Sequence, residues 1–181
     1  IEKWFQNRSV ETQELVRSKV ASWFSPPADM NAKIDELLAT LETGDAYRGQ
    51  DVFRNDKAAC IACHRIGYVG GTIGPELTRI GQSRTRRDFV EAIAFPSHRI
   101  AQGYQTTSVL TEDDEVYSGL VASEDSTRIE LILSATKRIS LDKKSIVKRA
   151  QGTTSIMPAG IEKVLTTREL SDLIAFLEQS R

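Results

Sequence analysis

Apolar side chains recur every three to four positions near the start of the chain, which is the period of an α-helix. The pattern begins after Ser9, a residue suited to cap a helix, and stops at residues 25–27, which include two prolines. A second apolar stripe covers residues 34–41. We therefore predict an N-terminal helical extension over residues 1–44.

This extension carries four large aromatic side chains, Trp4, Phe5, Trp23 and Phe24. Contiguous apolar surface of this kind is used for packing or for contact with a partner. Two arrangements fit the pattern. The helices fold back on the rest of the chain, or they dock onto a second subunit or a longer chain, and the second arrangement includes a homo-oligomer formed through the N-terminal helices.

Residues that begin or end helices predict three further helices. Asp45 is suited to cap the first of them. A short helix over residues 87–95 ends before Pro96, because a proline ring disfavours helical geometry in the preceding residue. The last helix begins at Thr166 and Glu169, which have the spacing of a capping box.

The period changes to a partial alternation of apolar and polar residues between positions 104 and 147, where β-branched residues are frequent. Polar turns at residues 112–115 and 123–126 divide this stretch. It predicts a small antiparallel β insert with one face packed against the helices. The expected fold is thus mainly α, and residues 45–181 form one helical domain that contains the insert.

Composition limits the possible functions. The chain has 181 residues, of which 40% are hydrophobic and 27% charged, so it is long enough for one well-packed domain or two small ones. A formal net charge of -1 argues against nucleic-acid binding, which needs an excess of Lys and Arg. No apolar run approaches the roughly 20 residues needed to cross a bilayer. Because the chain begins at Ile1, we expect a processed product or a segment of a longer protein.

The pentapeptide CIACH contains Cys60 and Cys63, the only two cysteines, followed at once by His64, one of two histidines. Two thiols separated by two residues can add across the two vinyl groups of a haem, and the adjacent histidine can reach the iron from the same side. This chemistry accounts for all three residues.

Other uses of the motif explain less of it. A thioredoxin-like redox pair is expected between a strand and a helix, which is not the predicted context. A structural zinc site needs two further ligands, and the only remaining histidine is His98, with no further cysteine. A plain disulfide leaves His64 without a role.

The residues around the motif extend this interpretation. The segments YRGQDVF, GGTIGPEL and SIMPAG, together with CIACH and the closing helix, resemble the class I mono-haem cytochromes c. Within that class they are most similar to the haem-binding domain of planctomycetes and verrucomicrobia, which carries a strand-rich stretch before its methionine. The first 44 residues lie outside the resemblance.

The resemblance implies a set of site residues. His64 is the proximal iron ligand, and the carbonyl of Pro75 holds its second ring nitrogen, although Pro75 could also serve only to shape its loop. Met157, in a short loop before the last helix, is the opposite ligand. Met30 is interpreted as core packing and His98 as a surface residue that is the fallback ligand.

Charge patterns add little. Arg79, Arg84, Arg86 and Arg87 gather after the haem loop, where they could pair with haem propionates, steer an acidic partner or form a solvated face. No Ser-His-Asp set can be assembled, and the acidic pair at 113 and 114 lies in a polar turn. Hydrolytic chemistry is therefore not predicted.

The expected function is electron transfer by one covalently bound haem c, with no enzymatic activity of the chain itself. The resemblance implies a periplasmic or otherwise exported protein, a redox partner protein, and a place as the C-terminal electron-accepting domain of a larger dehydrogenase. The alternative is a gas-binding or peroxidatic haem protein, in which the sixth iron position is open or displaceable.

Overall fold

The structure of the chain is a computed structural model that describes residues 29–181. The helix predicted after Ser9 and the aromatic residues of the proposed oligomer surface lie outside the described residues. Of the predicted N-terminal extension, residues 29–44 are described, and they contain helix α3 (Met30–Thr40).

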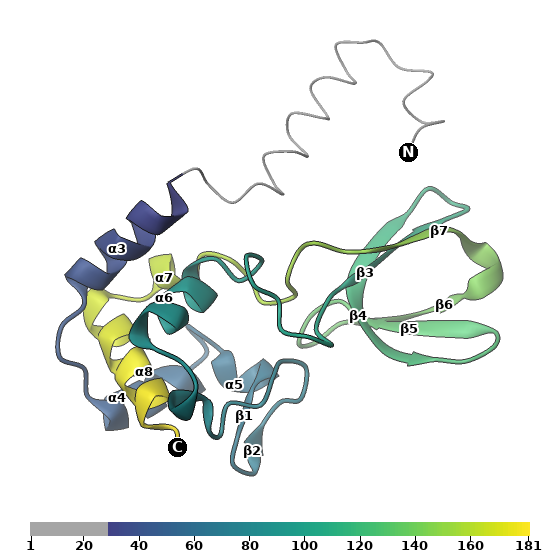
Figure 1. The fold of residues 1–181 in the computed structure, drawn as a ribbon. Helices are drawn as coiled ribbons and strands as arrows, with labels where there is room; N and C mark the ends of the chain where they lie inside the picture. The colour runs from purple at the N-terminus through teal and green to yellow at the C-terminus, as the bar shows by residue number, and fades with distance from the viewer. Residues whose placement is uncertain (1–28) are drawn as a thin grey trace.

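Helices form one part of the described chain (Figure 1). Its elements after α3 are α4 (Ala46–Arg54), α5 (Cys60–Cys63), the short hairpin β1 (Arg65–Ile66) and β2 (Val69–Gly70), the 3₁₀ turn η1 (Ile80–Gln82), α6 (Arg86–Ala94), α7 (Ile161–Val164) and α8 (Thr167–Gln179). The predicted caps are confirmed at two of these helices. Asp45 accepts the backbone N–H groups at the start of α4, and Thr166 and Glu169 form the capping box of α8.

The close crossing of α4 and α8 organises the helical part. Gly49 allows it, because a Cβ atom at that position would lie 1.9 Å from the carbonyl oxygen of Asp172. The Asp172 side chain is only 3% exposed. It accepts hydrogen bonds from the backbone N–H of Asp45 at 2.6 Å and from Nε of Arg48 at 2.8 Å. These charge-assisted bonds compensate for the burial of the carboxylate.

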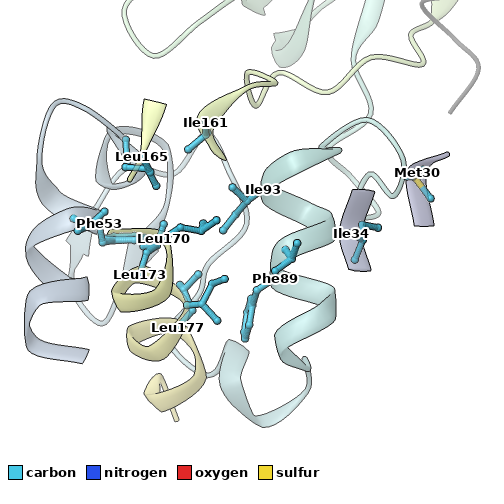
Figure 2. Close-up of a cluster of buried hydrophobic side chains, with 14 residues drawn as sticks. Met30, Ile34, Phe53, Phe89, Ile93, Ile161, Leu165, Leu170, Leu173 and Leu177 are labelled. Atoms are coloured by element: carbon cyan, nitrogen blue, oxygen red, sulfur yellow. The ribbon is translucent and has the colours of Figure 1, made fainter. Parts of the chain in front are cut away.

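The main hydrophobic core fills the space between α4, α6 and α8. Phe89 and Ile93 of α6 project toward Leu173 and Leu177 of α8 (Figure 2). Met30 belongs to the same core and is 8% exposed, in agreement with its interpretation as a packing residue. The core thus fixes the helices that surround the cysteine motif.

A five-stranded antiparallel sheet lies to one side of the helices (Figure 1). Its strands are β3 (Thr107–Thr111), β4 (Val116–Glu124), β5 (Arg128–Ile132), β6 (Arg138–Asp142) and β7 (Ile146–Gln151), in the order β6-β5-β4-β3-β7. Only the 3₁₀ turn η2 (Lys143–Ser145) separates the two edge strands, so the sheet must curl. Glu124 of β4 bridges this end, at 2.7 Å from Lys143 and 2.9 Å from Arg149.

The prediction of a mainly α fold is wrong. Helices and 3₁₀ turns take up 37% of the described residues and strands 22%, so the chain is a mixed structure with six short helices and a substantial sheet. The expected packing of the sheet on the helices is also wrong. Its buried residues Val109, Ile129, Leu131 and Leu141 form a separate core in which only residues of the sheet and its turns take part. The alternation of the sequence therefore reflects burial inside a curled sheet.

Within residues 29–181, no helix combines the length and the apolar character that crossing a membrane requires.

Candidate functional site

The cysteine motif forms a single helical turn, α5, whose last residue is followed by His64. The backbone N–H of His64 donates to the carbonyl of Cys60 at 2.9 Å, which closes the turn. Ala59 precedes it with a left-handed φ of 49°, so the chain bends sharply into the motif. Both cysteines are free thiols. The turn brings the two sulfur atoms and the imidazole to one wall of the same cavity.

The imidazole of His64 is held in one orientation. Its Nδ1 lies 2.8 Å from the carbonyl oxygen of Pro75. A carbonyl can only accept, so Nδ1 carries the proton and the neutral ring leaves Nε2 with a free lone pair. Gly74 packs against the ring, because a Cβ atom there would lie 2.6 Å from Cε1 of His64. The hydrogen bond expected for Pro75 is therefore present.

Burial keeps this imidazole neutral. It lowers the pKa of His64 below its usual value, and the hydrogen bond to Pro75 offsets the shift only in part. A neutral imidazole with one free lone pair is the form that binds a metal ion.

The two thiols are not activated for redox exchange. Burial raises the pKa of Cys60 to about 11 and also raises the pKa of Cys63. The reactive cysteine of a thioredoxin-like pair has a lowered pKa instead, because the thiolate is the attacking species. The chemistry of these thiols therefore disfavours the disulfide-exchange interpretation.

A cavity of about 570 Å³ opens beside the motif. Cys60, Cys63, His64 and Met157 all line it, and the rest of its wall is mostly apolar. Ligand cavities of roughly 300–1,000 Å³ accommodate groups of cofactor size. A haem needs an apolar slot with two thiols, an imidazole and a second soft donor at its wall, and these residues supply that set. The residues present thus fit the group.

The methionine loop is anchored to the segment after α6. Met157 donates its backbone N–H to Oγ of Ser155 at 3.1 Å, and the backbone N–H of Ser155 donates to Oγ of Ser97 at 3.0 Å. The fallback ligand His98 is not part of the cavity wall in the described chain. Its Nδ1 lies 2.7 Å from a carboxylate oxygen of Glu91.

The arginines after the haem loop have separate surroundings. Arg86 forms two hydrogen bonds with Glu178, at 3.0 and 2.7 Å, and Arg87 pairs with Asp35. Both are surface ion pairs. Arg84 instead lines the cavity, and Arg79 lies in a neighbouring groove.

The wall residues that were not predicted include two from the sheet and one buried carboxylate. Ser134 and Ala135, in the turn between β5 and β6, reach the cavity from the sheet, and the buried Glu91 reaches it from α6. The sequence offers no signal for the first two, because their position depends on how the sheet is placed beside the helices. Glu91 lies within an apolar stretch of a predicted helix. A charged residue at such a position is unusual, and this signal could have indicated a site residue.

No protein-family model matches the chain, and no similar curated protein was found. The resemblance to class I cytochromes c therefore stays a prediction from the motifs.

Proposed function

We propose that the chain is a one-electron carrier with a single haem c, bound through thioether bonds to Cys60 and Cys63. His64 and Met157 would hold its iron. The observation that carries the proposal is that two thiols, one oriented imidazole and one thioether line a single, mostly apolar cavity. This set matches the donors that a covalently attached haem requires.

Each of these residues has a defined task. Cys60 and Cys63 each add their S–H across one vinyl group, so that no oxidant is needed. Pro75 retains the Nδ1 proton of His64, which directs Nε2 toward a metal and raises its basicity. The neutral thioether of Met157 favours the ferrous state and hence a relatively high reduction potential. A bound haem supplies an iron that changes between the ferric and ferrous states.

The setting of the protein follows from the same proposal. Covalent attachment implies assembly outside the cytoplasm, so we expect an exported protein. An electron carrier also needs a partner protein, and the resemblance to haem-binding domains of larger dehydrogenases supports a place as an electron-accepting domain of such an enzyme.

The proposed ligands are tested by substitution in the haem-loaded full chain. Met157→Ala should remove the weak near-red absorption of a methionine-ligated ferric haem, lower the reduction potential and allow carbon monoxide to bind the ferrous form. Met30→Ala is the matched control, because Met30 is core packing and should change stability without changing these signals.

Two outcomes would contradict the ligand assignment. If Met157→Ala is spectrally silent and His98→Ala alone opens the iron, the ligation is bis-histidine. If the unmodified protein already binds carbon monoxide, the sixth position is open, and the gas-binding alternative replaces electron transfer.

A further inference from the structure

A second hollow adjoins the cavity on the outer side of Ile80. This groove has a volume of about 680 Å³ and lies between the β1–β2 hairpin and the loop that leads into η1. Arg65 and Tyr68 come from the hairpin, and Glu76 and Arg79 come from the loop. Ile80 lines both the groove and the cavity. A molecule bound in the groove is therefore separated from the cavity by the side chain of Ile80.

Hydrogen bonds fix the shape of the groove. The backbone N–H of Gly67 donates to Oγ1 of Thr78 at 2.8 Å, and that hydroxyl donates to a carboxylate oxygen of Glu76 at 2.6 Å. The other oxygen of Glu76 accepts from Arg65 at 3.3 Å. The hairpin and the loop are thus joined, and a preformed surface loses little conformational entropy on binding.

The groove contains hydrogen-bond donors without a partner and an excess of positive charge. It holds two guanidinium groups and one carboxylate. Within residues 29–181, the guanidinium of Arg79 makes no ion pair or side-chain hydrogen bond. Nε of Arg65 is buried and also has no hydrogen-bond partner there. A carboxylate placed here would gain the charged donors of Arg79 and would lie beside the Arg65 side chain, which is 43% exposed.

An apolar surface borders these charges. Tyr68 is fully exposed, and the neighbouring Val69 is 55% exposed. Tyr and Arg are the residue types enriched at the energetic centres of protein interfaces. An exposed tyrosine beside an exposed guanidinium without a direct ion pair in residues 29–181 is therefore typical of a protein-binding surface.

We propose that this groove docks the redox partner, a protein that presents a carboxylate to Arg79 and Arg65 and an apolar side chain to Tyr68. The proposal rests on the proposed electron-transfer function and adds the location and the chemistry of the partner site. Docking here places the partner next to Ile80, across from the cavity.

Paramagnetic mapping tests the site directly. Hexacyanochromate(III), a redox-inert trianion, is titrated into ¹⁵N-labelled full-chain protein at low salt. Amide resonances of Tyr68, Arg79 and Ile80 should broaden first, and added salt should reverse the effect. Arg79→Gln should remove the broadening. Arg86→Gln makes the same change in net charge but lies outside the groove, and it should leave the broadening intact.

Electron-transfer rates give the second measurement. Oxidation of the ferrous protein by anionic hexacyanoferrate(III) should slow several-fold in Arg79→Gln, whereas oxidation by the cationic oxidant tris(1,10-phenanthroline)cobalt(III) should not slow. Equal slowing with both oxidants would mean a changed potential and would overturn the proposal. Broadening centred on the basic segment 143–149 of the sheet would overturn it as well. Absence of covalent haem would refute the proposed function instead, and the anion mapping does not depend on that result.

Discussion

His64 has the most narrowly defined surroundings of any residue in the site. The carbonyl of Pro75 fixes its protonated nitrogen, and Gly74 contacts its ring. The motif and the resemblance predicted His64 and Pro75 from the sequence. The role of Gly74 could not be predicted, because a glycine in a glycine-rich loop is indistinguishable from one that only permits a turn.

Gly74→Ala should therefore disturb the imidazole. The added Cβ would lie 2.6 Å from Cε1 of His64, so the ring or the loop must move and the hydrogen bond to Pro75 should lengthen. We expect loss of the six-coordinate haem spectrum in most of the protein, measured by visible absorption after loading. Gly103→Ala is the control, because Gly103 has a φ of +85° with no atom near its Cβ position, so it strains the backbone without touching the ring. Equal spectral loss in both variants would contradict the specific role of Gly74.

Secondary-structure elements were predictable where their signals are local. The capping residues Asp45 and Thr166 gave the starts of α4 and α8, and Pro96 gave the end of α6 within two residues. The strands were also expected between residues 104 and 147. The sequence could not predict which element covers the apolar face of each strand. Apolar and polar residues alternate in the same way whether a strand packs on a helix or inside its own curled sheet.

The capping box of α8 should make stability depend on pH in the acid range. Lys57 first, and then Thr166, lower the pKa of Glu169 to about 2 from an ordinary value of 4.5. The ionised carboxylate therefore contributes stability at neutral pH, and this contribution is lost as the pH falls from about 4.5 to about 2. Glu169→Gln should lower the free energy of unfolding at pH 7 by about 1 kcal/mol and flatten its decline over this range.

Denaturant unfolding at several pH values measures this effect. Glu42→Gln is the comparison: within residues 29–181 the Glu42 side chain forms one surface ion pair, with Arg168, so its loss should lower the free energy of unfolding less. The free energy of unfolding could decline between pH 4.5 and 2 in Glu169→Gln as steeply as in the unmodified protein. This result would show that other carboxylates control acid unfolding.

The turn between β5 and β6 should influence the haem, although the sheet has its own core. Ala135 lines the cavity, so Ala135→Asp would place a carboxylate at its wall, stabilise ferric iron and lower the reduction potential. Ala122→Asp makes the same change on β4, away from the cavity wall, and should leave the potential nearly unchanged. Protein-film voltammetry compares the two, and equal shifts would mean that the turn is not part of the site.

At the scale of the whole molecule, the described chain has two hydrophobic cores that share no residue. Strands β3–β7 make their main contacts with one another, and the helices do the same. Because the β5–β6 turn still reaches the cavity, the sheet is joined to the site while its stability depends on separate contacts.

A large-to-small substitution in one core should therefore destabilise the part of the molecule that contains this core more than the other part. Leu131 is fully buried, and Leu131→Ala should destabilise the sheet by about 2–5 kcal/mol. Hydrogen exchange should show lost protection in β4 and β5 with α8 little changed. Leu173→Ala should give the reverse pattern. Equal loss across both parts in either variant would show that the chain unfolds as one cooperative unit.

Electron transfer by this chain depends on the covalent binding of one haem by Cys60 and Cys63. The most direct measurement is the pyridine haemochrome of the denatured full chain, produced with the haem-attachment machinery and extracted with acid acetone. We expect one haem per chain that stays on the protein, and a Cys60→Ser, Cys63→Ser double variant that loses it entirely. Colourless protein with a free thiol titre of two, equal to its number of cysteines, would show that neither cysteine binds a haem.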